Sequence, residues 1–144
     1  MGRGAGAGRT LNVPCPAGFG DAEFARLFDE AIVPILRQFA PEFVLISAGF
    51  DCDGRDPLGG LVLTPAGIAR MARVLTSLAE ERAGGRIVAV LEGGYDLAAL
   101  TDGLDAVLDA FRGASEPEAV RGDARAADGV LARVRAAHAA YWRL

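Results

Sequence analysis

The sequence predicts an α/β fold built on a parallel sheet. Residues 43–48 and 86–91 are short, nearly continuous apolar runs, and a helical pattern separates them. Strands that are apolar on both faces are typical of parallel sheets covered by helices. A strand–helix–strand unit is almost always a right-handed parallel crossover, so the two strands should run in the same direction.

Composition narrows the class of protein. The chain has 144 residues, 51% of them hydrophobic, which suits one globular domain or part of one. The net charge of −4 gives nucleic-acid binding no electrostatic support. No apolar run is long enough to span a membrane, and the N-terminus lacks the apolar stretch of a signal peptide, so we expect a cytoplasmic protein. The two cysteines, Cys15 and Cys52, are expected to be reduced.

The N-terminal part reads as a loop followed by a helix. Residues 1–20 contain spaced glycines, but a phosphate-binding loop would need a strand before them and a helix directly after them. Residues 21–39 carry apolar side chains at helical spacing, and Asp21 can cap or favour the start of this helix. Pro34 predicts a kink or a break within it, and Pro41 ends it.

Two further helices follow the two strands. Thr64 and Pro65 are typical of a helix start, and the glycine pair at 84–85 ends that helix. Asp96 can cap the second helix, residues 97–111. We expect the apolar residues of both helices, Leu104 and Leu108 among them, to face inward.

The rest of the chain divides into a linker and a last helix. Residues 1–112 form the main unit, residues 113–123 a linker, and residues 124–144 an alanine-rich helix on the domain edge. His138, the only histidine, lies on this helix among alanines and is interpreted as a surface or edge residue.

Polar residues follow both strands at the point where each ends. Asp51 comes just after residues 43–48, and Tyr95 follows residues 86–91 and the glycine pair Gly93-Gly94. In open α/β sheets, ligands bind beyond the carboxyl ends of the strands. The sequence therefore predicts that Asp51 and Tyr95 meet on one rim of the sheet.

The pattern alone leaves two interpretations for each of these residues. Asp51 is either a metal-ligating carboxylate or a turn residue in a loop that also holds Asp53 and Asp56. Tyr95 either donates a hydrogen bond to a developing oxyanion or packs over the start of the next helix. Asp56 is expected to bond backbone amides of its own loop.

Two apolar neighbours complete this loop. Leu58 could line the wall of a pocket. Cys52 could bind a soft metal, but an inert, half-buried thiol fits better, because its side chain and that of Asp51 point apart on an extended segment.

Three ordered motifs in these segments resemble the C-terminal portion of the histone deacetylase family. That family includes class II-like members and the acetoin-utilisation and acetylpolyamine amidohydrolase relatives. The motifs are TLNVPCPAGFGD, LISAGFDCDGRDPLGGLVLTPAGI and IVAVLEGGYDLAAL, which cover most of residues 9–100 in the family's order. The resemblance implies the C-terminal part of a three-layer, arginase/deacetylase-like α/β fold with a parallel sheet.

The resemblance also implies a site and a substrate class. It implies a catalytic Zn²⁺, with Asp51 as one of its ligands and Tyr95 as the hydrogen-bond donor to the substrate carbonyl. Gly93 and Gly94 would let the acyl group lie against backbone, Leu58 would line the acyl-lysine tunnel, and Asp56 would be structural in the loop. The implied substrates are acetylated lysine or polyamine-like amides.

The departures from the family pattern concern the other half of the site. A catalytic zinc needs three protein ligands, and the family's Asp-x-His and paired histidines have no counterpart in this chain. Asp53 stands where the family loop commonly has histidine.

Two hypotheses follow. The first is a zinc-dependent deacetylase whose site is incomplete in this chain, because the chain is a truncated portion of the domain. The second is a non-catalytic remnant that binds a partner. A nucleotide-binding domain ranks below both, because its glycine fingerprint is absent.

Overall fold

The computed structural model describes residues 1–113, 120 and 122–144, and most of the linker predicted for residues 113–123 lies outside them. Helices dominate the chain, with one pair of strands. In chain order the elements are η1 Gly4–Gly6, α1 Asp21–Leu27, the π-helical turn η2 Phe28–Ile32, α2 Val33–Phe39, β1 Val44–Ala48, α3 Pro65–Ala83, β2 Ile87–Leu91, α4 Leu97–Phe111, η3 Arg125–Ala127 and α5 Asp128–His138.

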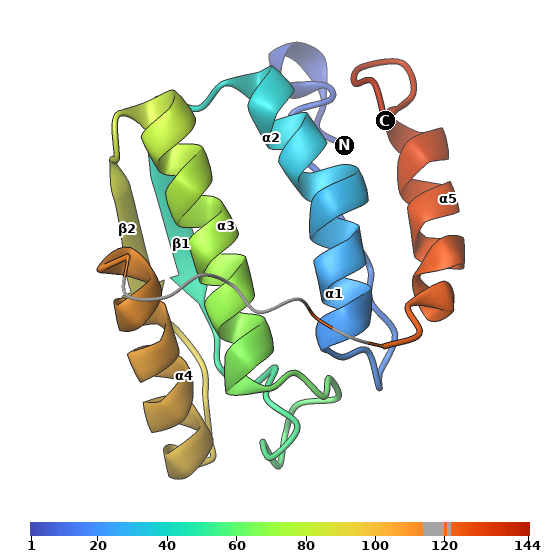
Figure 1. Cartoon of the computed structure of the whole chain (residues 1–144). Coiled ribbons are helices and arrows are strands. Elements are labelled where there is room, and N and C mark those ends of the chain that lie inside the picture. The colour runs from blue at the N-terminus through green and yellow to red at the C-terminus, as the bar shows by residue number, and fades with distance from the viewer. Residues whose placement is uncertain (114–119, 121) are drawn as a thin grey trace.

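The two strands form a parallel pair, as the sequence predicted. The register runs from Val44 opposite Ile87 to Ala48 opposite Leu91, and α3 is the crossover between the strands. Helix α3 lies over both strands, with α1 and α2 beside it and α5 on the far side of those (Figure 1). Both strands therefore end at the same edge of the sheet.

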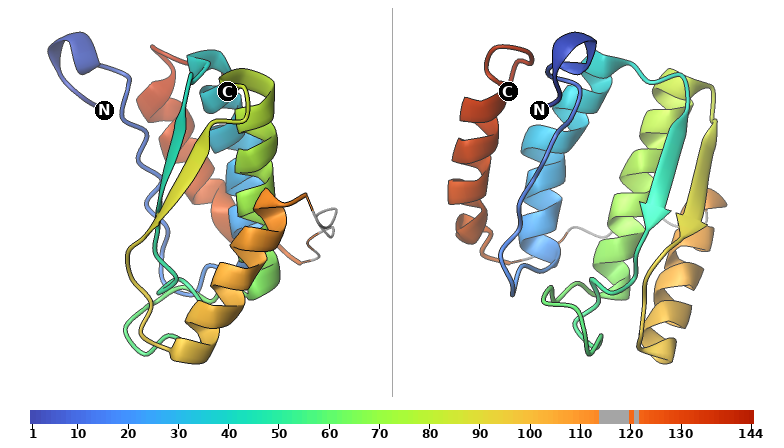
Figure 2. Two further views of the ribbon diagram at one scale, coloured as in Figure 1. Left: turned by 90° about the vertical axis from the view of Figure 1, so that its left-hand side faces the viewer. Right: turned by 180° about the vertical axis from the view of Figure 1, so that it is seen from behind.

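One face of this sheet has no helix over it in the described part of the chain. The side view puts α3 and α4 on one side of the strands, and the view from behind shows the strands uncovered (Figure 2). Leu45 is 67% exposed, and Val88 and Val90, which share its face, are exposed as well. The described residues therefore supply two of the three layers that the resemblance implies.

The helix predicted for residues 21–39 runs through a π-helical turn. The N–H of Val33 bonds the carbonyl of Phe28, five residues earlier, and Pro34 follows at the start of α2. Proline has no N–H to give to the preceding turn, and a π turn is one way to absorb that loss without ending the helix. The interruption predicted at Pro34 takes this form.

The N-termini of α3 and α4 are capped as the sequence predicted. The Thr64 hydroxyl accepts the N–H of Gly67 at 3.4 Å, and the Asp96 carboxylate accepts that of Ala99 at 2.7 Å. Asp21 lies in the first turn of α1, where a negative charge favours the helix start, but the N-cap residue is Gly20 and the Asp21 carboxylate bonds another helix. It accepts the N–H and the hydroxyl of Thr64 at 2.9 and 2.6 Å, and so joins the start of α1 to the start of α3.

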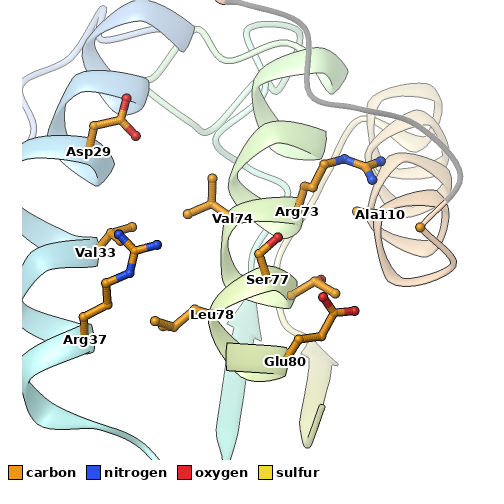
Figure 3. Close-up of a pocket in the computed structure, with 11 residues that line it drawn as sticks. Asp29, Val33, Arg37, Arg73, Val74, Ser77, Leu78, Glu80 and Ala110 are labelled. Carbon is orange, nitrogen blue, oxygen red and sulfur yellow. The ribbon is translucent and has the colours of Figure 1, made fainter. Parts of the chain in front are cut away.

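The outer face of the helical layer is hollowed between α2 and α3 (Figure 3). This cavity of about 590 Å³ has a mixed lining that includes Arg37, Ser77 and Glu80. Two of its lining residues form ion pairs: Arg37 with Glu81 at 3.0 Å, and Asp29 with Arg70 at 2.8 Å. It lies on the side of α3 away from the sheet.

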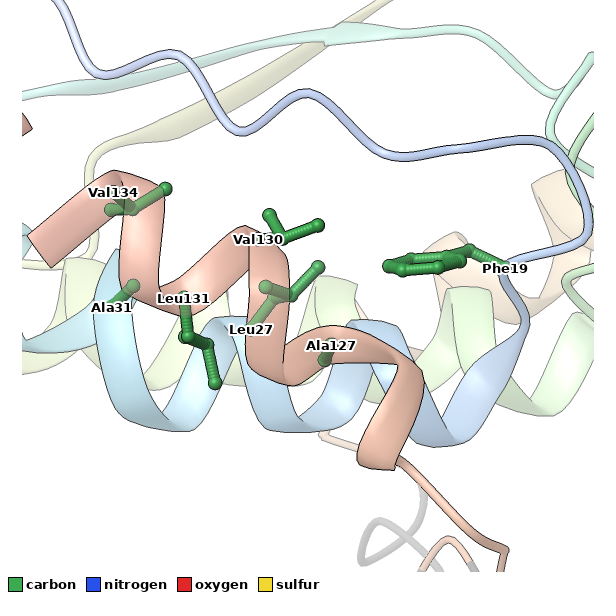
Figure 4. Close-up of a cluster of buried hydrophobic side chains, with 7 residues drawn as sticks. All are labelled: Phe19, Leu27, Ala31, Ala127, Val130, Leu131 and Val134. Carbon is green, nitrogen blue, oxygen red and sulfur yellow. The ribbon is translucent and has the colours of Figure 1, made fainter.

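Two core clusters hold the helices together. The first packs α5 against α1 and η2, with Phe19 closing one end (Figure 4). The second lies under α3 and α4, where Phe50, Leu63 and Ile68 are at most 5% exposed. Because α5 shares the first cluster with α1, the last helix is part of the same packed body.

Three expectations about helical faces are wrong. His138 is 1% exposed rather than at the surface, because it continues the stripe that Val130 and Val134 begin on α5. Leu104 and Leu108 on α4 are each 39% exposed, because the side of α4 that is buried carries Gly103, Val107 and Ala110 instead.

No helix among the described residues has the length and apolarity needed to cross a membrane.

Candidate active-site rim

Backbone hydrogen bonds join the loops that follow the two strands. The N–H of Glu92 bonds the carbonyl of Ala48 at 3.0 Å, and the N–H of Phe50 bonds that of Gly93 at 2.9 Å. These bonds continue the parallel pairing past the strand ends. The segments that carry Asp51 and Tyr95, remote in sequence, therefore lie on one rim.

The Asp51 carboxylate lies against the glycine after β2. A methyl group placed on Gly93 would lie 3.0 Å from Asp51 Oδ2 and 3.2 Å from its Cγ. This spacing leaves no room for a larger residue at position 93 unless the carboxylate moves. Asp51 is half-buried, with its oxygens next to the backbone of the second loop.

Asp56 connects the two loops through a buried carboxylate. Oδ1 accepts the N–H groups of Leu58 and Gly59 at 2.8 and 3.0 Å, and Oδ2 accepts that of Tyr95 at 2.7 Å. Burial alone would raise the pKa of the Asp56 carboxyl, but the hydrogen bonds from Tyr95, Leu58 and Gly59 outweigh it and lower that pKa. The carboxylate bonds its own loop, as expected from the sequence, and also holds the backbone of Tyr95.

The side chains of Tyr95 and Leu58 project into solvent in this chain. Tyr95 is 60% exposed and Leu58 is 73% exposed. Gly94, between the two loops, has a φ of 141°, which a residue with a side chain rarely adopts. The backbone of the rim is thus fixed by hydrogen bonds, whereas the side chains of Tyr95 and Leu58 are exposed to solvent.

Asp53 is a buried ion-pair partner rather than a free carboxylate on the rim. It is 2% exposed, and its oxygens accept the Nε and Nη2 groups of Arg55 at 2.9 and 3.0 Å. The hydrogen bonds from the Arg55 guanidinium lower the pKa of Asp53 below its usual range. Asp53 is therefore paired with an arginine two residues along the same loop.

Sequence reasoning missed Arg55 and its second partner. Arg55 Nη1 donates to Asp102 Oδ2 on α4 at 2.7 Å. The Asp-x-Arg spacing from Asp53 to Arg55 was the available signal, because an arginine two residues after a turn aspartate can fold back onto it. Nothing in the sequence marked Asp102, 47 residues further on.

Cys52 packs inward beside Asp51. Its Sγ lies 3.4 Å from the Gly49 carbonyl, and the side chain contacts the second core cluster. Burial raises the pKa of this thiol to about 11, and the neighbouring carboxylates add to the shift. A thiol in this state is a poor metal ligand and a poor nucleophile.

The described residues do not assemble a complete metal site. No group of three or more His, Cys, Asp or Glu side chains within them could hold a metal ion. His138 is buried on α5, on the opposite side of the molecule from α4 and the rim (Figure 1). A carboxylate at position 51 suits a zinc ligand, but it is one donor where a catalytic zinc needs three.

A family model and named relatives match most of the chain. The model for the histone deacetylase domain matches residues 1–111. The chain is 44% identical over 112 residues to histone deacetylase 14, chloroplastic, of Arabidopsis thaliana, and covers 26% of that protein. It is 46% identical over 96 residues to a probable deacetylase of Archaeoglobus fulgidus, of which it covers 27%. These matches take in 78% and 67% of the chain.

Solved deacetylase structures share its fold. The structure of the histone deacetylase Clr3 aligns over 99% of this chain and 24% of its own, with a TM-score of 0.88 and 32% identity. The HDA15 HD domain aligns over 98% of this chain and 37% of its own, with a TM-score of 0.84 and 35% identity. The parallel sheet and helices are thus part of a deacetylase catalytic domain, and the chain belongs to the histone deacetylase family.

Proposed function

We propose that the chain contributes one side of the active site of a zinc-dependent deacetylase that hydrolyses acetyl-lysine or related N-acetyl amides. The observation that carries the proposal is the joined rim, where the Asp51 carboxylate lies against Gly93 and Asp56 holds the backbone of Tyr95. The relatives' names support the deacetylase class. The net charge of −4 gives nucleic-acid binding no electrostatic support.

Each rim residue has a role in this proposal. Bound zinc would polarise the amide carbonyl and activate a water molecule. Asp51 would supply one ligand, and the Tyr95 hydroxyl would donate a hydrogen bond to the carbonyl oxygen as its negative charge develops. Gly93 and Gly94 would leave backbone against the acyl group, and exposed Leu58 would form part of the tunnel wall.

The site needs more than these 144 residues. Asp51 is the one zinc ligand that we assign on this rim, and buried His138 cannot reach it from α5. We therefore propose that the remaining ligands and the proton-transfer groups come from other sequence, and that the chain by itself binds zinc weakly and has little activity. We expect the completed enzyme to be cytoplasmic.

A second candidate function is a non-catalytic module that binds a protein partner. The uncovered sheet face, with Leu45 and Val88 exposed, favours it. The two candidates differ in one property: a deacetylase uses Asp51 and Tyr95, whereas a binding module does not need either.

The test uses a completed domain, made by joining the upstream part of the Archaeoglobus fulgidus relative to this chain. Metal analysis of the purified protein compares Asp51→Ala with Asp105→Ala, which removes an exposed carboxylate from α4. We expect Asp51→Ala to lose bound zinc and Asp105→Ala to keep it. Undiminished zinc in Asp51→Ala would show that Asp51 is only a turn residue.

A further inference from the structure

Arg55 joins the loop after β1 to helix α4. Two of its nitrogens bond the buried Asp53 carboxylate, and the third, Nη1, bonds Asp102 at 2.7 Å. Asp102 lies on the second turn of α4 and is half exposed. One guanidinium thus bridges two acidic side chains that come from different elements.

Two other contacts join the same pair of elements. Gly103 packs against Phe50, so closely that a methyl group on Gly103 would lie 2.5 Å from the phenyl ring. Tyr95, two residues before α4 begins, gives its N–H to Asp56. Phe50 directly precedes Asp51, so all three contacts lie within a few residues of the rim.

We propose that Arg55 is a positioning residue that fixes Tyr95 relative to Asp51 by clamping α4 onto the loop that carries Asp51. The proposal rests on the deacetylase function proposed above, in which Tyr95 and Asp51 act on one carbonyl. Arginine suits the task because its planar fork can bind two carboxylates at once, which a lysine ammonium cannot do in the same geometry.

The clamp acts locally. The side chains of Arg55 and Asp102 are 43% and 52% exposed, and exposed ion pairs add little to global stability. Removing Arg55 does not test the link to α4 alone, because it also leaves the buried Asp53 carboxylate without its partner. Asp102→Asn tests this link more specifically, because it removes the negative charge at the α4 end and leaves the Asp53–Arg55 pair in place.

The experiment is amide hydrogen exchange by NMR on the 144-residue chain. We expect Asp102→Asn to speed exchange at the Tyr95 amide by about two- to fivefold. A change of this size corresponds to the free energy that one exposed ion pair contributes. Exchange of the Leu131 amide in the first core cluster should not change. Asp105→Asn, the same change one turn along α4, should leave Tyr95 as in the wild type. Equal exchange at Tyr95 in Asp102→Asn and wild type would overturn the proposal.

A second control comes from the chain itself. Asp123 and Arg125 repeat the Asp-x-Arg arrangement at the surface, away from the rim. Asp123→Asn should leave Tyr95 exchange unchanged. An equal acceleration in this variant would mean that loss of any such pair loosens the chain, and the clamp would be rejected.

Kinetics of the completed domain then separate the clamp from the proposed function. We expect Asp102→Asn to lower kcat about two- to fivefold, with KM and zinc content unchanged. An unchanged kcat would overturn the positioning role. If the wild-type completed domain showed no turnover, the proposed function would fail, whereas the exchange result on the chain would still decide whether the clamp exists.

Discussion

Tyr95 combines a fixed backbone with an open side chain. Its N–H is held by the buried Asp56 carboxylate at 2.7 Å, yet 60% of the residue is exposed. In the proposed role, orienting the Tyr95 phenol towards a substrate carbonyl would cost little, because the backbone has already lost its freedom. The proposal that Tyr95 is a hydrogen-bond donor draws support from this arrangement.

Replacing this tyrosine tests its role. In the completed domain, Tyr95→Phe should lower kcat by about 10²–10³-fold, as for loss of one oxyanion donor. Zinc content should stay the same, because the hydroxyl is not a ligand. Tyr141→Phe, at another exposed tyrosine, should have no effect on turnover. Wild-type turnover in Tyr95→Phe would remove Tyr95 from the mechanism.

The Cys52 thiol gives a second residue-scale prediction. With a pKa of about 11 instead of 9.0, its thiolate fraction near neutral pH is about a hundredfold lower than that of an ordinary thiol. We expect iodoacetamide to alkylate Cys52 slowly in the folded chain and at the normal rate in urea. Mass spectrometry measures both rates. Rapid labelling of folded protein would contradict its inward placement.

At the scale of elements, α4 matters because of how closely it approaches the loop after β1. Gly103 makes that approach possible, since any side chain there would meet the Phe50 ring. Gly129 on α5 is a useful contrast. Its surroundings are open, and the nearest atom to an added methyl group would be Arg133 Nη1 at 3.7 Å.

The same substitution should therefore have opposite effects at the two glycines. Gly103→Ala should destabilise the chain by about 1–3 kcal/mol through overpacking against Phe50. Gly129→Ala should stabilise it by about 0.5–1 kcal/mol, because alanine favours helix more than glycine does. Urea denaturation measures both. A neutral or stabilising Gly103→Ala would mean that α4 lies further from Phe50.

Local sequence signals predicted the elements well and their long-range contacts poorly. The strands and the Thr64 and Asp96 caps depend on neighbouring residues, and the structure has them where the pattern put them. Asp21 lies in the first turn of its own helix, as the pattern predicts, yet its carboxylate bonds Thr64, 43 residues away. Sequence spacing carries no information about such a partner.

At the rim, too, the sequence predicts the topology but not the long-range side-chain contacts. That Asp51 and Tyr95 share an edge followed from parallel topology. The Arg55–Asp102 pair could not be predicted, because it depends on how α4 packs after the fold has formed. His138 could have been placed correctly, because its spacing from Val130 and Val134 is helical.

At the scale of the whole molecule, the uncovered sheet face is the largest departure from a finished α/β domain. Leu45, Val88 and Val90 alternate outward from the two strands and stay exposed. Parallel sheets are normally covered on both faces. The chain spans 24% and 37% of the two solved structures it resembles, so these positions fit a surface that other parts of a deacetylase domain cover.

This face should bind hydrophobic dye and promote self-association. Leu45→Glu should reduce both dye fluorescence and sedimenting oligomer, because it places a charge in the middle of the face. The unfolding free energy should change by less than about 0.5 kcal/mol, as for other surface substitutions. Leu97→Glu, exposed on α4 instead, is the matched control. Equal dye binding in both variants would show that the dye binds an apolar surface other than this sheet face.

The most direct test of the central claim is zinc-dependent turnover of an acetyl-lysine peptide by two proteins: the purified 144-residue chain and the completed domain. We propose that this chain carries one zinc ligand and the oxyanion donor of a shared site. We therefore expect turnover that requires zinc, Asp51 and Tyr95 in the completed domain, and little or none by the chain alone. Robust zinc-dependent turnover by the chain alone would contradict it.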